Sequence, residues 1–265
     1  EQDLVEKQKE QQRQEEFHQS KIRMFTNFSH ELRTPLMLIL SPLEEVLQRV
    51  DMNPNLKGSL RLVYGNAQRL LLLVNQLMDL RKNQSGNLQL RVSHNDLYPF
   101  TLEIYIAFNQ IAVKERIIFR LESDESGIDA WFDRVLLEKV FFNLLSNAFK
   151  HTAPDESITI RLQSFSVAGL QEQFPGRISG EVRGTSRYVC LSVEDTGKGI
   201  DDSDKFHIFS PFYQGTDESE SNTAGTGIGL SQVLSIVKLH KGVVWVEGNK
   251  PKGAVFRVLI PVNRE

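Results

Sequence analysis

The stretch FTNFSHELRTPL, residues 25–36, decides how the N-terminal part of the chain folds. It places His30 beside the carboxylate of Glu31 and one helical turn before the hydroxyl of Thr34. The apolar residues of the stretch recur at helical spacing, so His30 lies on a polar stripe beside an apolar one. A neutral imidazole in that place can act as a nucleophile while the rest of the helix packs. Pro35 removes one backbone hydrogen bond and predicts a bend just after His30.

Helical periodicity continues on both sides of this stretch. It covers residues 17–50, and a turn at 51–54 separates it from a second helical pattern at 55–82. Two long helices with a short connection predict an antiparallel hairpin. Each helix carries more apolar surface than one partner covers, so we expect two hairpins to form a four-helix homodimer. Residues 1–16, almost wholly Glu, Gln, Lys and Arg, are interpreted as the end of a coiled-coil connector; a frayed, solvated helix is the alternative.

The composition limits the classes of function. With 265 residues, 40% hydrophobic and 25% charged, the chain has room for one large globular domain or two smaller ones. A net charge of −3 gives no basic field, so we expect no direct contact with nucleic acid. The chain has a single cysteine, Cys190, which excludes an internal disulfide and a cysteine zinc cluster. The residues that flank Cys190 predict a buried strand. No apolar run approaches the roughly 18 residues of a membrane span, and the missing initial Met suggests a fragment of a longer protein.

The pattern changes after the polar segment 83–95, which we interpret as a hinge. Short β-rich runs then alternate with helical patterns at 96–114, 133–150 and 229–240. This alternation predicts an α/β sandwich, a mixed sheet covered on one face by helices, and an α+β class for the whole chain. The segment 165–186 has little periodicity and is expected to be a loop or hairpin excursion. The predicted strands span residues 88–92, 117–121, 130–132, 157–164, 187–194, 243–247 and 254–261.

Three polar residues share one face of the helix predicted at 133–150. Asn143, Asn147 and Lys150 lie at i, i+4 and i+7. Amide oxygens are suitable neutral ligands for Mg²⁺, and a lysine can supply charge to a phosphate. An ordinary polar helix face is the alternative, and the spacing alone does not decide between the two.

Two glycine-rich stretches bracket a long acidic loop. The stretch DTGKG, residues 195–199, follows a predicted strand, so the carboxylate of Asp195 is suited to accept from the exocyclic amine of a base. The stretch GTGIGL, residues 225–230, opens a predicted helix, whose N-terminus offers N–H groups to phosphates. It is no Walker loop, because no Gly-Lys-Ser/Thr follows, and no Rossmann turn, because no strand leads into it. A loop as long as 201–223 is uncommon unless it is functional. We therefore interpret it as a lid over a ligand, which its aromatic residues attach to the domain.

In order along the chain, SHELRTP, LLSNAFKHT, DTGKG, the Phe-rich lid and GTGIGL resemble the catalytic core of a sensor histidine kinase of two-component signalling. The resemblance covers residues 17–262. It implies a dimerisation and histidine phosphotransfer domain at 17–82. It also implies an ATP-binding domain of the Bergerat type at 96–265, with the strand predicted at 88–92 as a candidate first element. Type II topoisomerases, mismatch-repair ATPases and heat-shock chaperone ATPases share that domain type.

The resemblance implies a role for each matching position. His30 is similar to the phosphoacceptor, Glu31 to its general base, and Thr34 to the hydroxyl that helps water attack the phosphorylated partner in a phosphatase reaction. Asn147 resembles the Mg²⁺ ligand and Asp195 the adenine-binding carboxylate. The other implied nucleotide-site positions are Asn143 beside the metal ligand, Lys150 near the phosphates, Gly197 and Gly199 in the first glycine box, Phe209 and Phe212 in the lid, and Gly225, Thr226, Gly227, Gly229 and Leu230 in the second glycine box.

The implied cofactors are ATP and Mg²⁺. The implied partners are a second copy of the chain and the receiver domain of a response regulator, in trans or in the same full-length chain, because the wording of the boxes resembles the hybrid subgroup. The implied location is the cytoplasmic portion of an inner-membrane-anchored sensor. The sequence departs from the family at Ala254, where Ser or Thr is common, and at His151, where Tyr is common.

Two other classes of function remain as alternatives. One is a conformational machine driven by a Bergerat-type ATPase, which gives no reason for the stretch SHELRTP. The other is a non-catalytic dimeric scaffold, which the near-complete set of motifs disfavours.

Overall fold

The computed structural model describes residues 32, 35–48, 53–84, 89–175, 187–213, 215 and 227–263. The chain divides into two compact units, Glu1–Leu88 and Gln89–Glu265. The connector predicted at 1–16 lies outside the described residues.

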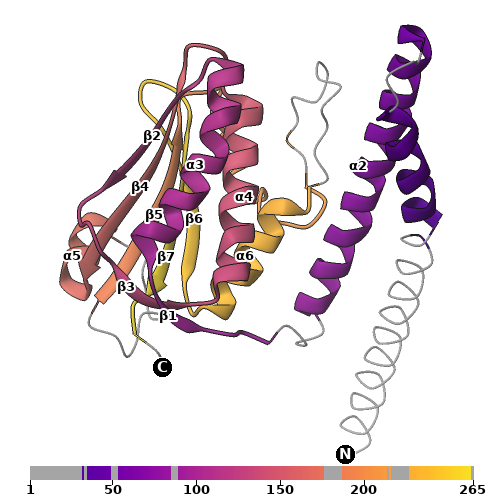
Figure 1. The fold of residues 1–265 in the computed structure, drawn as a ribbon. Helices are drawn as coiled ribbons and strands as arrows, with labels where there is room; N and C mark the ends of the chain where they lie inside the picture. Colours follow the sequence, from indigo (N-terminus) through magenta and orange to yellow (C-terminus); the bar gives the residue numbers. More distant parts are fainter. Residues whose placement is uncertain are drawn as a thin grey trace, which may run out of the picture. The chain divides into compact units, whose positions relative to one another are not determined.

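The first unit is helical where the structure describes it. Residues 35–47 form a helical segment, and α2, Pro54–Gln84, confirms the helix predicted at 55–82 (Figure 1). The bend predicted just after His30 falls outside the described residues. Across the described part of the chain, no helix is both long and apolar enough to cross a bilayer. The apolar surface that the predicted homodimer would cover includes the exposed side chains of Met37, Leu38, Ile39, Leu56, Leu62, Val63 and Leu70.

The second unit is built on a mixed five-stranded sheet with the strand order β2-β4-β5-β7-β6. Of its strands, β2 (Ile118–Ser123) runs parallel to β4 (Ser157–Ser166), and the other neighbours are antiparallel. These other strands are β5 (Arg187–Asp195), β7 (Ala254–Pro261) and β6 (Val243–Gly248). The mixed sheet confirms the predicted architecture.

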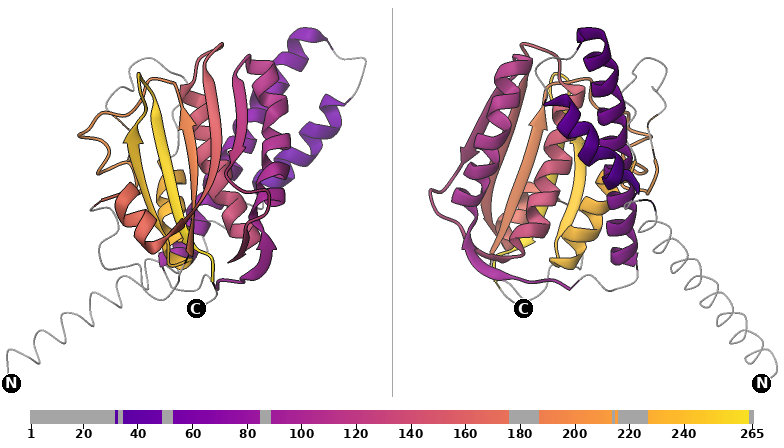
Figure 2. Two further views of the ribbon diagram at one scale, coloured as in Figure 1. Left: turned by 90° about the vertical axis from the view of Figure 1, so that its left-hand side faces the viewer. Right: turned by 45° about the vertical axis from the view of Figure 1, so that its right-hand side comes forward.

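Helices cover one face of this sheet. Figures 1 and 2 show α3 (Leu97–Glu115), α4 (Arg134–His151) and α6 (Gly229–Leu239) lying along it. The start of α4 is fixed to the end of α6, because the backbone N–H of Asp133 donates to Nε2 of His240 at 3.0 Å. Aliphatic and aromatic side chains fill the space between helices and sheet, as expected for an α/β sandwich. The second unit is therefore the predicted α/β sandwich, and with the helical first unit the chain belongs to the predicted α+β class.

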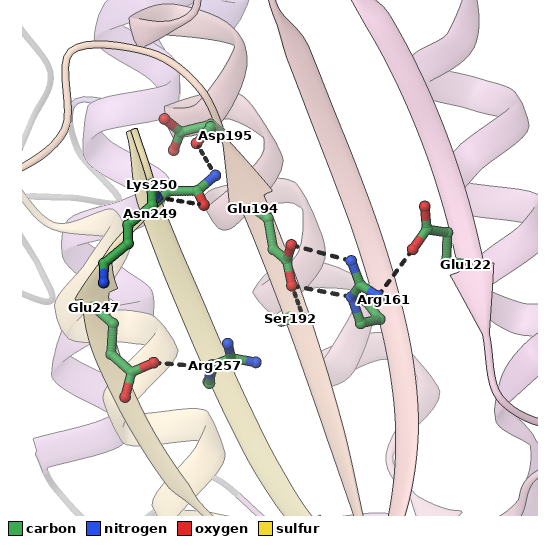
Figure 3. A network of polar contacts seen from close by, with 9 residues as sticks. All are labelled: Glu122, Arg161, Ser192, Glu194, Asp195, Glu247, Asn249, Lys250 and Arg257. Atoms are coloured by element: carbon green, nitrogen blue, oxygen red, sulfur yellow. Dashed lines mark hydrogen bonds and ion pairs between the residues drawn. The ribbon is translucent and has the colours of Figure 1, made fainter. Parts of the chain in front are cut away.

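The opposite face of the sheet carries charged pairs. Figure 3 shows Arg161 on β4 between two carboxylates from neighbouring strands, Glu122 and Glu194. Its guanidinium lies 3.0 Å from Glu122 and 3.2 Å from Glu194. On the same face, Arg257 pairs with Glu247 at 3.1 Å. This side of the sheet thus carries cross-strand ion pairs, whereas α3, α4 and α6 lie along the other side.

The segment 165–186, predicted as a loop or hairpin excursion, connects the antiparallel strands β4 and β5, but its first half has regular structure. There β4 extends to Ser166, whose hydroxyl accepts from the N–H of Gly169 at 3.1 Å and caps a short helix, α5 (Val167–Gln173). A helix so short gives too few repeats for periodicity to reveal it. Cys190 is buried in the core, as predicted, and this burial raises the pKa of its thiol to about 12. The apolar cluster around α5 comprises Leu170, Phe174, Tyr188, Cys190, Trp245 and Leu259.

The strand predicted at 88–92 is wrong in its position. Strand β1 spans Ser93–Asp96 and pairs with β3 (Asp129–Phe132) in a separate two-stranded antiparallel sheet. The carboxylate of Asp96 also caps α3 by accepting from the N–H of Tyr98 at 3.0 Å. The pairing with β3 and this cap fix the position of the strand. The apolar pattern a few residues earlier, on which the predicted strand is based, does not decide it.

Candidate nucleotide site

The base end of the candidate site is built around Asp195, the last residue of β5. The residue is only 4% exposed, and its Oδ1 accepts from the N–H of Gly197 at 3.0 Å and from the N–H of Ala254 at 3.2 Å. Burial raises the pKa of this carboxyl, and the two N–H donors oppose that shift. With Oδ1 occupied, Oδ2 is the oxygen left to accept from a ligand. Gly199 follows in the same loop with φ of 80°.

The turn before β7 packs closely against the main chain of Asp195. A Cβ on Gly253 would lie 2.0 Å from the carbonyl oxygen of Asp195, and Gly253 has φ of 111°. Both observations require glycine there, because an L side chain would be strained and would clash with main-chain atoms. The sequence does not mark Gly253 as part of the site.

The polar face of α4 has two differently engaged amides. The amide nitrogen of Asn143 donates to the carbonyl of Lys139 at 2.8 Å and to Oε1 of Gln232 at 3.1 Å. The half-buried side chain of Asn147 makes no hydrogen bond within the described residues. Lys150, one turn further along, is exposed. Of these residues, Asn147 has the amide oxygen that is open to a cation.

The start of α6 meets the same face of α4. A Cβ on Gly229 would lie 2.6 Å from Oδ1 of Asn143, so only a glycine allows this approach without a shift. The helix begins after Ile228 with no side-chain cap, and Leu230 is its second residue. Its first N–H groups are therefore uncapped by side chains, which suits an anion. Gly225 and Thr226, in the same glycine box, lie outside the described residues.

The described first half of the predicted lid, residues 201–213, consists of successive turns. The ring of Phe209 packs edge-on against Phe256 of β7, with 6.4 Å between centroids. Phe212 is 59% exposed, and its N–H donates to the carbonyl of Gly227 at 2.8 Å. The segment is thus attached both to the sheet and to the glycine turn before α6.

His151 ends α4 beside the first glycine loop. Its carbonyl oxygen accepts from the N–H of Lys198 at 3.4 Å. Desolvation of the ring, followed by the charges of Lys150 and Lys198, lowers its pKa to about 4, although the residue as a whole remains exposed. The imidazole is therefore neutral near pH 7.

The structure brings the predicted residues together in two groups. Asp195 and Gly197 meet at the base end, and Asn143 meets Gly229 at the start of α6. The predicted residues His30, Glu31 and Thr34 lie outside the described residues. Sequence reasoning missed Gln232, because its contact with Asn143 joins positions 89 residues apart and no local spacing signals it.

The fold and the site together define a nucleotide-binding α/β sandwich that follows a helical unit. The chain belongs to the histidine kinase family: residues 132–264 match the histidine kinase-, DNA gyrase B- and HSP90-like ATPases, and residues 20–86 match the His Kinase A (phospho-acceptor) domain. Membership of this ATPase family implies that the second unit binds ATP.

Relatives of the chain bear histidine kinase names. It is 34% identical over 258 residues to histidine kinase P4 of Formosa agariphila, covering 96% of this chain and 17% of that protein. It is 31% identical over 247 residues to hybrid signal transduction histidine kinase D of Dictyostelium discoideum, covering 93% of this chain and 15% of that one. The solved catalytic domain of histidine kinase ThkA, 27% identical, covers 66% of this chain and 99% of its own with a TM-score of 0.51. The chain thus spans 17% or less of the length of these two relatives.

Proposed function

We propose that the chain is the catalytic core of a two-component sensor histidine kinase. In this proposal ATP phosphorylates His30, and the phosphoryl group then passes to an aspartate of a receiver domain. The observation that carries the proposal is that one chain joins both required parts. His30 lies inside the phospho-acceptor match at 20–86, and the ATPase match follows at 132–264.

The residues of the second unit fit ATP and Mg²⁺. Asp195 presents a free carboxylate oxygen to the exocyclic amine of adenine, and the uncapped start of α6 suits the phosphates. Asn147 would hold the metal, because its amide makes no hydrogen bond within the described residues. A bound Mg²⁺ supplies charge neutralisation between the phosphates. Asn143 would lie beside that position, hydrogen-bonded to Gln232, and Lys150 would contribute further positive charge.

Phosphoryl transfer needs only a neutral imidazole in line with the γ-phosphorus. One ring nitrogen of His30 attacks with its lone pair, and the bond from the γ-phosphorus to the bridging oxygen breaks, releasing ADP. Glu31 would hydrogen-bond the other nitrogen, fix the tautomer and accept its proton. Catalysis is then mainly positioning and charge neutralisation. The hinge predicted at 83–95, whose two ends belong to α2 and β1, would let the ATP-binding unit reach His30.

The partners follow from the same proposal. A second copy would cover the exposed apolar residues of 35–47 and α2, giving the four-helix dimer. The relative named a hybrid kinase supports a receiver domain within the full-length protein. Thr34 would help water attack the phosphorylated receiver domain in a phosphatase reaction. The core would work on the cytoplasmic side of a membrane-anchored sensor.

Incubation of the chain with radiolabelled ATP and Mg²⁺ tests the proposal. We expect a protein-bound label that acid removes and base preserves, because phosphohistidine has that stability. His30→Ala should lose the label, whereas His94→Ala, which changes an exposed histidine of the second unit, should keep it. An acid-stable label, or a label that persists in His30→Ala, contradicts the assignment. Steady ATP hydrolysis without any labelling would favour the alternative of an ATP-driven conformational machine.

A further inference from the structure

The turn between β6 and β7 holds the base end of the site at two points. The side-chain amide of Asn249 donates to the backbone carbonyl of Asp195 at 2.7 Å, as Figure 3 shows. Further along the same turn, the N–H of Ala254 donates to the carboxylate of Asp195 at 3.2 Å. The turn is closed on itself, because the N–H of Asn249 donates to the carbonyl of Gly253 at 2.9 Å.

Asn249 also replaces a missing hydrogen bond of the sheet. The pairing of β5 with β7 ends at Glu194 and Val255, one residue before Asp195. The carbonyl oxygen of Asp195 therefore accepts a hydrogen bond from the side-chain amide of Asn249 at the point where the pairing of the two strands has ended. A part-buried carbonyl without a donor is unfavourable, so this bond fixes the end of the strand that carries the carboxylate.

We propose that Asn249 is a positioning residue for adenine recognition, which acts through Asp195 and does not touch the base. This inference rests on the proposed function, in which Asp195 accepts from the adenine amine. The two N–H donors fix the rotation of the carboxylate, and Asn249 fixes the main chain behind it. Oδ2 then points in one direction only.

Fixed direction is what separates adenine from guanine. Adenine presents an exocyclic amine, which donates a hydrogen bond to an ionised carboxylate. Guanine presents a carbonyl oxygen at the same place, which the carboxylate repels. A carboxylate that is free to turn would lose part of both effects. Asn249 should therefore affect the ratio of ATP to GTP affinity more than it affects binding of the phosphates.

The test is calorimetric titration of the whole chain with ATP, GTP and inorganic tripolyphosphate. Asn249→Ala removes the amide, and Asn249→Asp keeps its shape while replacing the donor by an acceptor that faces a carbonyl. We expect ATP affinity to fall about threefold to tenfold in Asn249→Ala and further in Asn249→Asp, with tripolyphosphate affinity unchanged. Asn95→Ala is the matched control, because among the described residues the amide of Asn95 donates only within its own strand, to Ser93.

An unchanged ratio of ATP to GTP affinity in both Asn249 variants overturns the inference. So does an equal loss for all three probes, since a merely structural role would weaken the site as a whole. If Asn249→Ala does not fold, Asn249→Asp decides the question, because its carboxylate still accepts from the N–H of Lys250 as the amide does at 2.9 Å. Absence of ATP binding by the unaltered chain would instead refute the proposed function.

Discussion

The two ends of the candidate nucleotide site differ in the kind of atoms that make their contacts. At the base end, backbone N–H groups hold the carboxylate of Asp195. A Cβ on Gly253 would lie 2.0 Å from the carbonyl oxygen of Asp195. At the phosphate end, the contact of α6 with α4 is made by side chains: Asn143 bonds to Gln232, and its amide oxygen lies against Gly229. Main-chain atoms cannot turn away from an intruding group, whereas the end of a side chain can. We therefore expect the base end to be rigid and this contact at the phosphate end to be adaptable.

This difference matches what each end would recognise in the proposed function. Selecting one base requires a single hydrogen-bonding direction, which a strand end with fixed donors supplies. A triphosphate carries several equivalent oxygens and its charge is shared with a metal, so side chains that readjust are sufficient. Substitutions at the two ends should therefore have unequal costs.

The largest effect is expected from Asp195→Asn. The N–H groups of Gly197 and Ala254 both need an oxygen, so the new amide must direct its nitrogen toward the base. It would then donate to guanine and repel the amine of adenine. We expect ATP affinity to fall about tenfold to a hundredfold and the preference for ATP over GTP to disappear or reverse. Titration calorimetry with both nucleotides measures this.

Asp129→Asn is the control for Asp195→Asn, because Asp129 is an exposed carboxylate on β3 whose only ion pair in the described part of the chain is with exposed His94. It should leave both affinities unchanged. Retention of full ATP selectivity by Asp195→Asn would show that the base end does not read the base.

A glycine comparison measures the difference in rigidity directly. Gly253→Ala places a Cβ against main-chain atoms at φ of 111°, and we expect it to lower the free energy of unfolding by about 3 kcal/mol. Gly229→Ala meets only the movable amide of Asn143 and adds helix propensity at the start of α6, so its net effect should stay within about 1 kcal/mol. Urea unfolding followed by tryptophan fluorescence measures both, because Trp131 and Trp245 lie in the second unit.

The same pair of variants can break the comparison. Equal losses of stability would mean that the amide of Asn143 is as fixed as the backbone. A smaller loss for Gly253→Ala than for Gly229→Ala would mean that the turn before β7 relaxes freely.

The sequence predicts the parts of the site that lie on one element or one loop. Strand, turn and helix spacing places Asp195 beside its glycines and Asn143 beside Asn147, and the resemblance to histidine kinases implies their roles. Sequence spacing does not predict partners from distant strands and helices: Asn249 lies 54 residues from Asp195, and Gln232 lies 89 residues from Asn143. The same limit explains the errors in the fold, since β1 is positioned by its pairing with β3 and α5 by an apolar cluster on the sheet.

The smallest expected effect concerns His151, whose carbonyl joins the end of α4 to the base-end loop. Its pKa is lowered to about 4, while an unfolded histidine keeps its ordinary value of 6.5. Between these two values the unfolded chain binds more protons, so this group lowers stability as the pH falls from 6.5 toward 4 and adds no further change below that. Because His151 is exposed, solvent screens the effect. His151→Gln should therefore lose slightly less stability than the unaltered chain between pH 7 and pH 5 in urea unfolding. His94→Gln, which changes an exposed histidine elsewhere in the same unit, is the comparison variant. If His151→Gln loses as much stability as the unaltered chain, neither desolvation nor the charges of Lys150 and Lys198 act on the imidazole of His151.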